Sequence, residues 1–396
     1  MKGLFIVLLI MFVATPTLCA RVTPNAGSRV FNIFSYGAKG DGQTDDSQAF
    51  EKAWGDVCNA TQGTTTLLIP KGKSFMLRPV SFEGPCKPAA INIQFEGTII
   101  APKSVEAWKW PENNNRESWL RFWRINGLVI KGGGTFDGQG SAWWNKHSDR
   151  PIALQFLNCE NLALKTLNLV NSTRSHITIA SCKDSIITDI YISAPDDSPN
   201  TDGINISGSS NILIQDSKIE SGDDCIAINH GSTFINVTGV MCGPGHGISV
   251  GSLGKNGAYN TVEDIYVRNC TFQGTMNGAR IKTWMGGSGY ARKIRFEDII
   301  LIGVKNPVII DQQYDALIYN GLSTAVKVSD VTYSNVRGTS ASENAIILSC
   351  DASVGCTDIV LNNIDITLAA GGKTSALCSN AHGTASSFNP TVSCLS

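Results

Sequence analysis

Short runs of alternating apolar and polar residues recur along most of this chain. Examples are NLALKTLNL, SIITDIYI, NILIQDSKI and TFINVTGV, with Asn, Asp or Gly at the breaks. Strict alternation over a few residues predicts a β-strand with one buried face. If Leu164, Ile187, Ile214 and Val237 are equivalent positions, the repeats are spaced by 23, 27 and 23 residues.

A period near 23 residues leaves room for only three short strands and for no helix between them. Such repeats are typical of a solenoid in which each repeat forms one coil. They predict an all-β, single-domain parallel β-helix. A β-sandwich or propeller is the alternative, but each propeller repeat would need about four strands.

One segment near the start has helical periodicity. After the Gly-rich sequence YGAKGDGQ, the residues Ala49, Phe50, Ala53, Trp54 and Val57 fall on one helical face. We expect this short N-terminal helix to cap the open end of the coil stack. The cysteine-containing end of the chain is expected to cap the other.

The first twenty residues have the features of a secretory signal peptide. Lys2 supplies the positive charge, residues 4–13 form the apolar run, and small residues surround Ala20. The run is too short to span a membrane. We therefore expect a signal peptide over residues 1–20, a mature domain over 21–396, and a secreted protein with no membrane contact after cleavage.

The net charge of −1 argues against a nucleic-acid partner, because such partners usually need a basic surface. Binding of any other polyanion must depend on locally placed Lys and Arg. We expect a monomer. We expect no metal or other cofactor, because the cysteines lack metal-site spacing.

Secretion makes disulfides the natural interpretation of the cysteines. Twelve are encoded, and one of them, Cys19, leaves with the signal peptide. Local spacing predicts four pairs: Cys58–Cys86, Cys225–Cys242, Cys350–Cys356 and Cys378–Cys394. Cys159, Cys182 and Cys270 remain, so at least one thiol stays free or pairs between molecules. Five sequons permit N-glycosylation, at Asn59, Asn171, Asn205, Asn236 and Asn269.

Four polar residues in Gly-bounded turns recur at the spacing of one coil. Asp202 lies in SPNTDGI, Asp223 and Asp224 in SGDDC, and His246 in CGPGHGISVGS. Adjacent coils of a β-helix are about 4.8 Å apart. We therefore expect three carboxylates and an imidazole to line up on one face of three successive coils.

Stacked carboxylates repel each other, which raises the pKa of at least one. Such a cluster can combine a proton donor with ionised partners, as glycoside hydrolysis requires. A paired Asp motif alone more often binds Ca²⁺ or shapes a turn. Four such groups at coil spacing favour a catalytic site.

Arg280 and Lys282, in GARIKTW, arrive in the next coil-like step and share one face of a strand. They could simply neutralise the acidic cluster. Arg and Lys also bind carboxylates, which suits a sugar acid as substrate. Tyr314, in DQQYD, could pack on the sugar ring. Trp143 and Trp144 could do the same, although core packing is the favoured interpretation. His147 and His176 have no partner that the sequence identifies.

The motifs NTDG, GDDC, GHGISVGS and RIKT, in this order, resemble those of plant polygalacturonases, glycoside hydrolase family 28. YGAKGDGQTDD and GTFDGQGSAWW add to the resemblance. It implies a right-handed β-helix that hydrolyses the α-1,4-galacturonan of pectin, in the cell wall, with inversion and without a metal. NPVIIDQ and NVRGTS look most like pollen-type exopolygalacturonases, so exo action is expected. Endo action, a Ca²⁺-dependent pectate lyase and a catalytically silent wall-binding protein are the alternatives.

The resemblance also implies residue roles: Asp224 as general acid, Asp202 and Asp223 as activators of water, His246 as support for the acid, Arg280 and Lys282 as binders of the substrate carboxylate, and Asn200 and Tyr314 as further substrate contacts. One position departs from the family. Many members have a cysteine after the tyrosine, where this chain has Asp315, which puts a third central disulfide in doubt.

Overall fold

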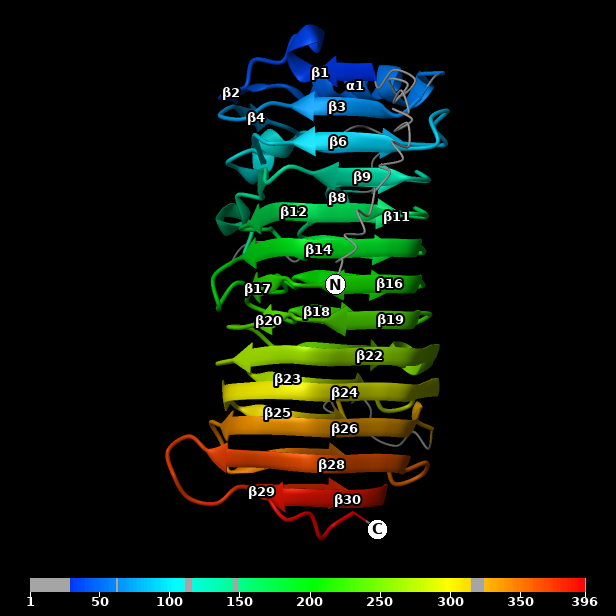
Figure 1. Cartoon of the computed structure of the whole chain (residues 1–396), viewed down its shortest axis with the longest axis vertical. Helices are drawn as coiled ribbons and strands as arrows, with labels where there is room; N and C mark the ends of the chain where they lie inside the picture. The colour runs from blue at the N-terminus through cyan, green and yellow to red at the C-terminus, as the bar shows by residue number, and fades with distance from the viewer. Residues whose placement is uncertain (1–28, 62, 111–115, 145–148, 315–323, 396) are drawn as a thin grey trace, which may run out of the picture.

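The chain forms a right-handed parallel β-helix whose coils stack from the N-terminal to the C-terminal end (Figure 1). This computed structural model describes residues 29–61, 63–110, 116–144, 149–314 and 324–395. The expected signal peptide, His147 and Asp315 lie outside these ranges. The predicted fold class is confirmed.

One face of the helix is an 11-stranded parallel sheet in which each coil contributes one strand in sequence order. Its strands are β5 (Val80–Glu83), β8 (Ser118–Trp123), β11 (Ile152–Leu157), β13 (Ile177–Ala180), β15 (Ile204–Ser207), β18 (Ile226–Ile228), β21 (Ile248–Leu253), β23 (Asn277–Thr283), β25 (Asn306–Asp311), β27 (Asn344–Ser349) and β29 (Ser375–Ser379).

The remaining faces belong to a 19-stranded sheet, because long bent strands join them. Its strands are β1 (Arg29–Asn32), β2 (Asp41–Asp45), β3 (Thr65–Ile69), β4 (Ser74–Met76), β6 (Ile91–Phe95), β7 (Thr98–Ile100), β9 (Leu128–Lys131), β10 (Thr135–Asp137), β12 (Ala163–Val170), β14 (Lys183–Ser193), β16 (Ser210–Gln215), β17 (Lys218–Glu220), β19 (Thr233–Thr238), β20 (Met241–Cys242), β22 (Tyr259–Gln273), β24 (Ser288–Val304), β26 (Lys327–Ser340), β28 (Cys356–Leu368) and β30 (Ala381–Asn389).

The core is a column of stacked aliphatic side chains inside the coils. Leu164 pairs with Ile187, Ile187 with Ile214, and Ile214 with Val237. All four are buried. The repeat alignment drawn from the sequence is therefore the true strand register, and each coil adds one apolar layer to a continuous core.

Asn and Asp residues in the left-handed region bend the long strands around the corners. Asn335 in β26 and Asn363 in β28 have φ values of 54° and 53°. Their side chains continue from coil to coil, since Asn363 donates to Asn335 at 2.8 Å and Asn335 donates to Asp298 at 2.9 Å. Short amides tolerate this conformation and hydrogen-bond locally, which explains the Asn and Asp at the strand breaks.

Helix α1 (Ser47–Asn59) covers the N-terminal end of the stack, as predicted (Figure 1). The five apolar residues of its predicted face are all buried. Trp54 also donates to the carbonyl of Glu83 at 3.1 Å, which fixes the helix on the first coils. Four short 3₁₀ segments complete the described helices: η1 (Ile33–Tyr36), η2 (Val105–Trp108), η3 (Gly140–Ala142) and η4 (Lys255–Gly257).

The four predicted disulfides are all present. Cys159, Cys182 and Cys270 are free thiols, and each is buried. Burial argues against the alternative that one of them pairs between molecules.

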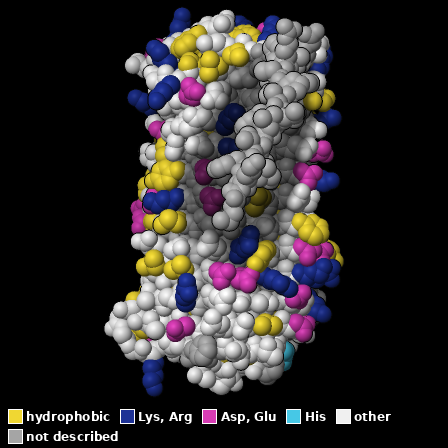
Figure 2. Space-filling model, in the orientation of Figure 1, with side chains coloured by type: hydrophobic (Ala, Val, Ile, Leu, Met, Phe, Trp, Pro, Cys, Tyr) yellow, Lys and Arg dark blue, Asp and Glu magenta, His cyan; other side chains and the backbone are white. Residues whose placement is uncertain are grey.

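Trp143 packs in the core, since only 3% of it is exposed and it meets Trp108 edge-on. Among the described residues, no helix combines the length and apolarity needed to cross a membrane. Figure 2 shows Lys and Arg interspersed with Asp and Glu on the face in view. Recognition of an acidic polymer would therefore depend on particular cations rather than on a basic surface.

Candidate active site

The three aspartates and His246 lie in the turns that lead into three consecutive strands, β15, β18 and β21. Ile204, Ile226 and Ile248 are in register across these strands. Asp202, Asp224 and His246 each precede them by two residues. The coil step from Asp224 to His246 thus matches the register, but Asp202 is in register with Asp224 and not with Asp223. The sequence spacing gave the right coils and was one residue out for this pair.

Glycines keep these turns tight. A Cβ atom on Gly222 would lie 2.1 Å from the carbonyl oxygen of Ser198. Gly247 has a φ of 87°, and a Cβ there would lie 2.2 Å from the oxygen of Asn277. Only glycine allows the coils to approach this closely, so the neighbouring Asp223 and His246 are brought together.

Asp224 lies at the buried centre of an ionic cluster. Arg280 donates to its Oδ1 at 2.6 Å and Lys282 to its Oδ2 at 2.8 Å. Ser249 donates to Oδ1 at 2.8 Å. Only 1% of the Asp224 side chain is exposed. Both carboxylate oxygens therefore accept charge-assisted hydrogen bonds, which hold the two cations of β23 in fixed positions.

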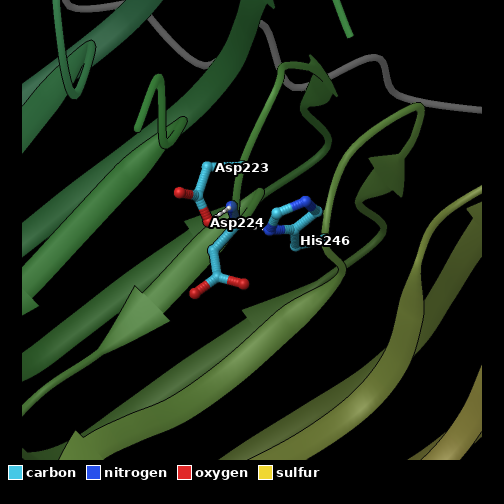
Figure 3. A group of neighbouring side chains, drawn as sticks. All are labelled: Asp223, Asp224 and His246. Carbon is cyan, nitrogen blue, oxygen red and sulfur yellow. Dashed lines mark hydrogen bonds and ion pairs between the residues drawn. The ribbon is translucent and has the colours of Figure 1, made fainter. Parts of the chain in front are cut away.

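Asp223 points elsewhere and pairs with the imidazole (Figure 3). Its Oδ1 lies 3.0 Å from Nδ1 of His246, and Asn200 donates to its Oδ2 at 3.2 Å. Burial opposes ionisation, but the hydrogen bond and charge of His246, helped by Lys282, lower the pKa of Asp223 overall. With 18% of its side chain exposed, Asp223 can reach a ligand where Asp224 cannot.

Asp202 has the opposite electrostatic environment. Burial, followed by the negative charges of Asp223 and Asp224, raises its pKa well above the ordinary value, although Lys282 opposes this. Its backbone is fixed by His176, whose N–H and Nδ1 both lie within 3.1 Å of the Asp202 carbonyl oxygen. Burial lowers the pKa of His176 to about 4. A neutral His176 therefore supports the turn that carries Asp202.

Two residues of this site were missed in the sequence. Arg150 donates to Oδ1 of Asn200 at 2.6 Å, which orients the amide that contacts Asp223. Asp311 in β25 is the register partner of Lys282 in β23, and burial raises the pKa of Asp311. The contact of Arg150 does not follow from coil spacing, because Arg150 lies in a loop. Asp311 lies one coil beyond Lys282 and was considered only as part of the DQQYD motif.

Tyr314 lies beside the cationic end of the site. Nζ of Lys282 is 5.2 Å from the centre of its ring, and Trp284 packs against the ring edge-on at 5.4 Å. The structure thus brings together all the predicted polar residues of the site, from Asn200 to Tyr314.

Several known proteins are similar to this chain in sequence and in fold. The sequence profile of the family "Glycosyl hydrolases family 28" matches residues 58–390. A probable polygalacturonase of Arabidopsis thaliana is 47% identical over 375 residues, which cover 93% of this chain and 81% of the relative. A polygalacturonase of Persea americana is 40% identical, over 88% of this chain and 76% of the relative.

The chain belongs to glycosyl hydrolase family 28. Solved structures agree on the fold of this family 28 protein. The endo-xylogalacturonan hydrolase of Aspergillus tubingensis superposes with a TM-score of 0.77 at 23% identity, covering 91% of this chain and 99% of that one. The exopolygalacturonase of Thermotoga maritima gives 0.73 at 22% identity, covering 90% and 93%.

Asp223, Asp224 and His246 offer ligand atoms within 4.8 Å of one another, a grouping that could hold a metal ion. In this family 28 protein, however, Arg280 and Lys282 already bind both oxygens of Asp224. A divalent cation there would be repelled by two nearby positive charges. The cluster therefore suits proton transfer better than metal binding.

The sequons differ in exposure. Asn59 and Asn269 are exposed, whereas Asn171, Asn205 and Asn236 are partly buried. Asn205 is in register with Ala227 and donates to Ser175 at 2.7 Å. A glycan on this face of the family 28 protein would obstruct the site, so Asn59 and Asn269 are the better acceptor candidates.

Proposed function

We propose that this protein is a secreted polygalacturonase that hydrolyses α-1,4-galacturonosyl linkages of polygalacturonan, the acidic polymer of pectin, with inversion. The observation that carries the proposal is the placement of two buried cations, Arg280 and Lys282, directly beside three acidic residues. Carboxylates supply acid and base for glycoside cleavage. The cations suit a substrate that carries a carboxylate on every sugar.

The contacts favour Asp223, together with His246, as the general acid. The resemblance to the family assigned this role to Asp224 and a supporting role to His246. His246 hydrogen-bonds Asp223, whereas Asp224 is almost fully buried and its oxygens bind two cations. An acid must reach the leaving oxygen and regain its proton after each cycle. The half-buried Asp223–His246 pair meets both needs, because the hydrogen-bonded imidazole can carry the proton of the pair while the pKa of Asp223 is lowered.

Asp202 is then the general base. A carboxylate with a raised pKa accepts a proton more readily, and burial together with the charges of Asp223 and Asp224 raises the pKa of Asp202. In the proposed step, Asp202 takes a proton from water as the water oxygen bonds to the anomeric carbon. The glycosidic bond breaks, and the leaving oxygen takes the proton of the Asp223–His246 pair. Asp224 lies in register with Asp202 and holds Arg280 and Lys282 in place beside it.

Arg280 and Lys282 are proposed to bind the carboxylate of the galacturonate at the cleaved bond. Asp224 fixes their position before substrate arrives, which reduces the ordering cost of binding. Tyr314, beside Lys282, is placed to pack on the sugar ring. Asn200, held by Arg150, is proposed to contact the sugar on the other side of Asp223.

The protein is further proposed to act in the cell wall as a monomer, without a metal or other cofactor. The four disulfides support an oxidising extracellular location. Exo action is favoured, on the motifs NPVIIDQ and NVRGTS. Early products decide this point, because monogalacturonate alone indicates exo action and a range of oligomers indicates endo action.

The proposal is tested with purified protein and polygalacturonate. Reducing ends are expected to appear without any unsaturated uronide absorbance, and a chelator should leave the rate unchanged. Unsaturated product, or loss of activity in chelator, would identify a Ca²⁺-dependent lyase instead. If no product forms between pH 4 and 7, the wall-binding alternative is favoured.

A further inference from the structure

Two of the three free cysteines occupy equivalent places in consecutive coils. Leu157 pairs with Ala180, and Glu160 with Lys183. Cys159 and Cys182 lie between these paired positions and are therefore in register. The backbone N–H of Cys159 lies 3.3 Å from the sulfur of Cys182, which places this sulfur next to the Cys159 backbone. Both side chains point into the coil, with exposures of 0% and 2%.

The spacing of the coils matches the geometry of a disulfide. Neighbouring parallel strands are about 4.8 Å apart. Disulfides form between residues whose Cα atoms are about 4.4 to 6.8 Å apart. A sulfur–sulfur bond between Cys159 and Cys182 therefore needs only side-chain rotation and no change in the register of the coils.

We propose that Cys159 and Cys182 close into a fifth disulfide, which links two consecutive coils, when the protein folds in an oxidising environment. Cys159 follows β11 and Cys182 follows β13, so the bridge would link these two coils immediately before the coil that carries Asp202. It also reduces the number of unpaired cysteines in the mature chain from three to one. With this pair closed, Cys270 is the single remaining thiol of the mature chain.

The oxidant required is a small-molecule disulfide such as oxidised glutathione, which reacts before the coils close around the sulfurs. The thiolate of one cysteine attacks the glutathione disulfide and releases one glutathione thiolate. The second protein thiolate then attacks the mixed disulfide and releases the other. The two protein thiols lose two electrons and two protons, and two glutathione thiols form.

Cys270 provides an internal control. It is equally buried, but its neighbour in register is Ile299 in β24. Its sulfur contacts the carbonyl of Arg268 at 3.2 Å, and burial raises its pKa to about 12. With an aliphatic side chain in register and little tendency to ionise, Cys270 is expected to remain a thiol under the same conditions.

The test is a thiol count on protein purified from a secreting host. The protein is unfolded in denaturant with N-ethylmaleimide, without reductant, and its peptides are mapped by mass spectrometry. We expect label on Cys270 alone and a peptide pair linked through Cys159 and Cys182. Label on all three cysteines would overturn the proposal.

Two variants sharpen the assignment. Cys159→Ser should release Cys182, so that both Cys182 and Cys270 react. Cys270→Ser should leave no reactive thiol and should keep the linked peptide pair. If Cys182 stays unlabelled in the Cys159→Ser variant, it has another partner and the proposed pairing is wrong.

Discussion

Two clusters of opposite charges lie on neighbouring coils of this β-helix, and they differ in how far their side chains are exposed to water. In the site, Asp224 binds Arg280 and Lys282 with at most 10% of any of these side chains exposed. On the 19-stranded sheet, Glu263 of β22 pairs with Arg292 and Lys293 of β24, and these cations are 44% and 51% exposed. One pair in each cluster has the same distance, 2.8 Å for Lys282–Asp224 and for Arg292–Glu263.

This difference in exposure distinguishes charged residues that only lie on the surface of the β-helix from those that can form a functional site. Water screens the Glu263 cluster, so its ion pairs add little to the stability of the β-ladder on which they lie. Removal of charges from water costs free energy, so the buried Asp224 carboxylate is stable only while both of its cations are present. The coil places both clusters by the same register, and burial decides which of them can do chemistry.

The largest expected effect is on turnover. Asp223→Asn removes the proposed acid and should lower kcat by at least about a thousandfold, or roughly 4 kcal/mol of barrier, with little change in Tm. Release of reducing ends from polygalacturonate measures this. Near-normal turnover would remove Asp223 from the role of acid, and the same variant at Asp224 would then become the leading candidate.

Asp224→Asn should lower stability as well as activity. It leaves Arg280 and Lys282 buried beside a neutral amide, and breaking a buried pair costs about 3 kcal/mol or more. Glu263→Gln is the matched control, because it removes one carboxylate charge from the exposed cluster and should hardly change Tm. Equal effects on the Tm of the two variants would show that burial does not distinguish the clusters.

His176 makes the region of the site sensitive to pH. Its pKa is about 4 in the folded protein and 6.5 in an unfolded chain. Between these values the unfolded chain binds the extra proton, so the contribution of neutral His176 is complete above pH 6.5 and is lost as pH falls toward 4. This contribution amounts to about 3 kcal/mol of the free energy of unfolding.

The check is the difference in Tm between the wild type and His176→Gln, measured from pH 7 to pH 4. The wild type should lose stability relative to the variant over this interval, and the difference should stay constant below pH 4. A difference that does not depend on pH would show that His176 titrates normally.

The smallest effect is expected on substrate binding. Lys282→Met should raise KM for polygalacturonate by about tenfold, because the substrate carboxylate loses a charged partner. Arg292→Met, in the exposed cluster, should leave KM unchanged. If KM of the two variants is the same, Lys282 only neutralises Asp224.

The sequence predicts the repeating architecture well, because one physical rule generates it. Leu164, Ile187, Ile214 and Val237 stack as expected, since each coil must bury the same apolar face. The same rule gathers Asp202, Asp224 and His246. It fails by one residue for Asp223, because a turn before a strand can add a residue that only the register reveals.

Contacts made by loops could not be predicted from the sequence. Arg150 reaches Asn200 across 50 residues, and no periodicity links the two. His176 lacked an identifiable partner because it binds the backbone carbonyl of Asp202, and backbone groups carry no sequence signal. The pairing of His246 with Asp223, on which the proposed acid depends, also required the geometry of the turns.

The central claim is that Asp202 and the Asp223–His246 pair perform hydrolysis with inversion on an acidic polymer. Proton NMR of the sugar formed in the first minutes of reaction on polygalacturonate tests it most directly. The account predicts that the new reducing end appears first as the β-anomer, which then equilibrates with the α-anomer. Initial formation of the α-anomer, or of an unsaturated uronide, would contradict it.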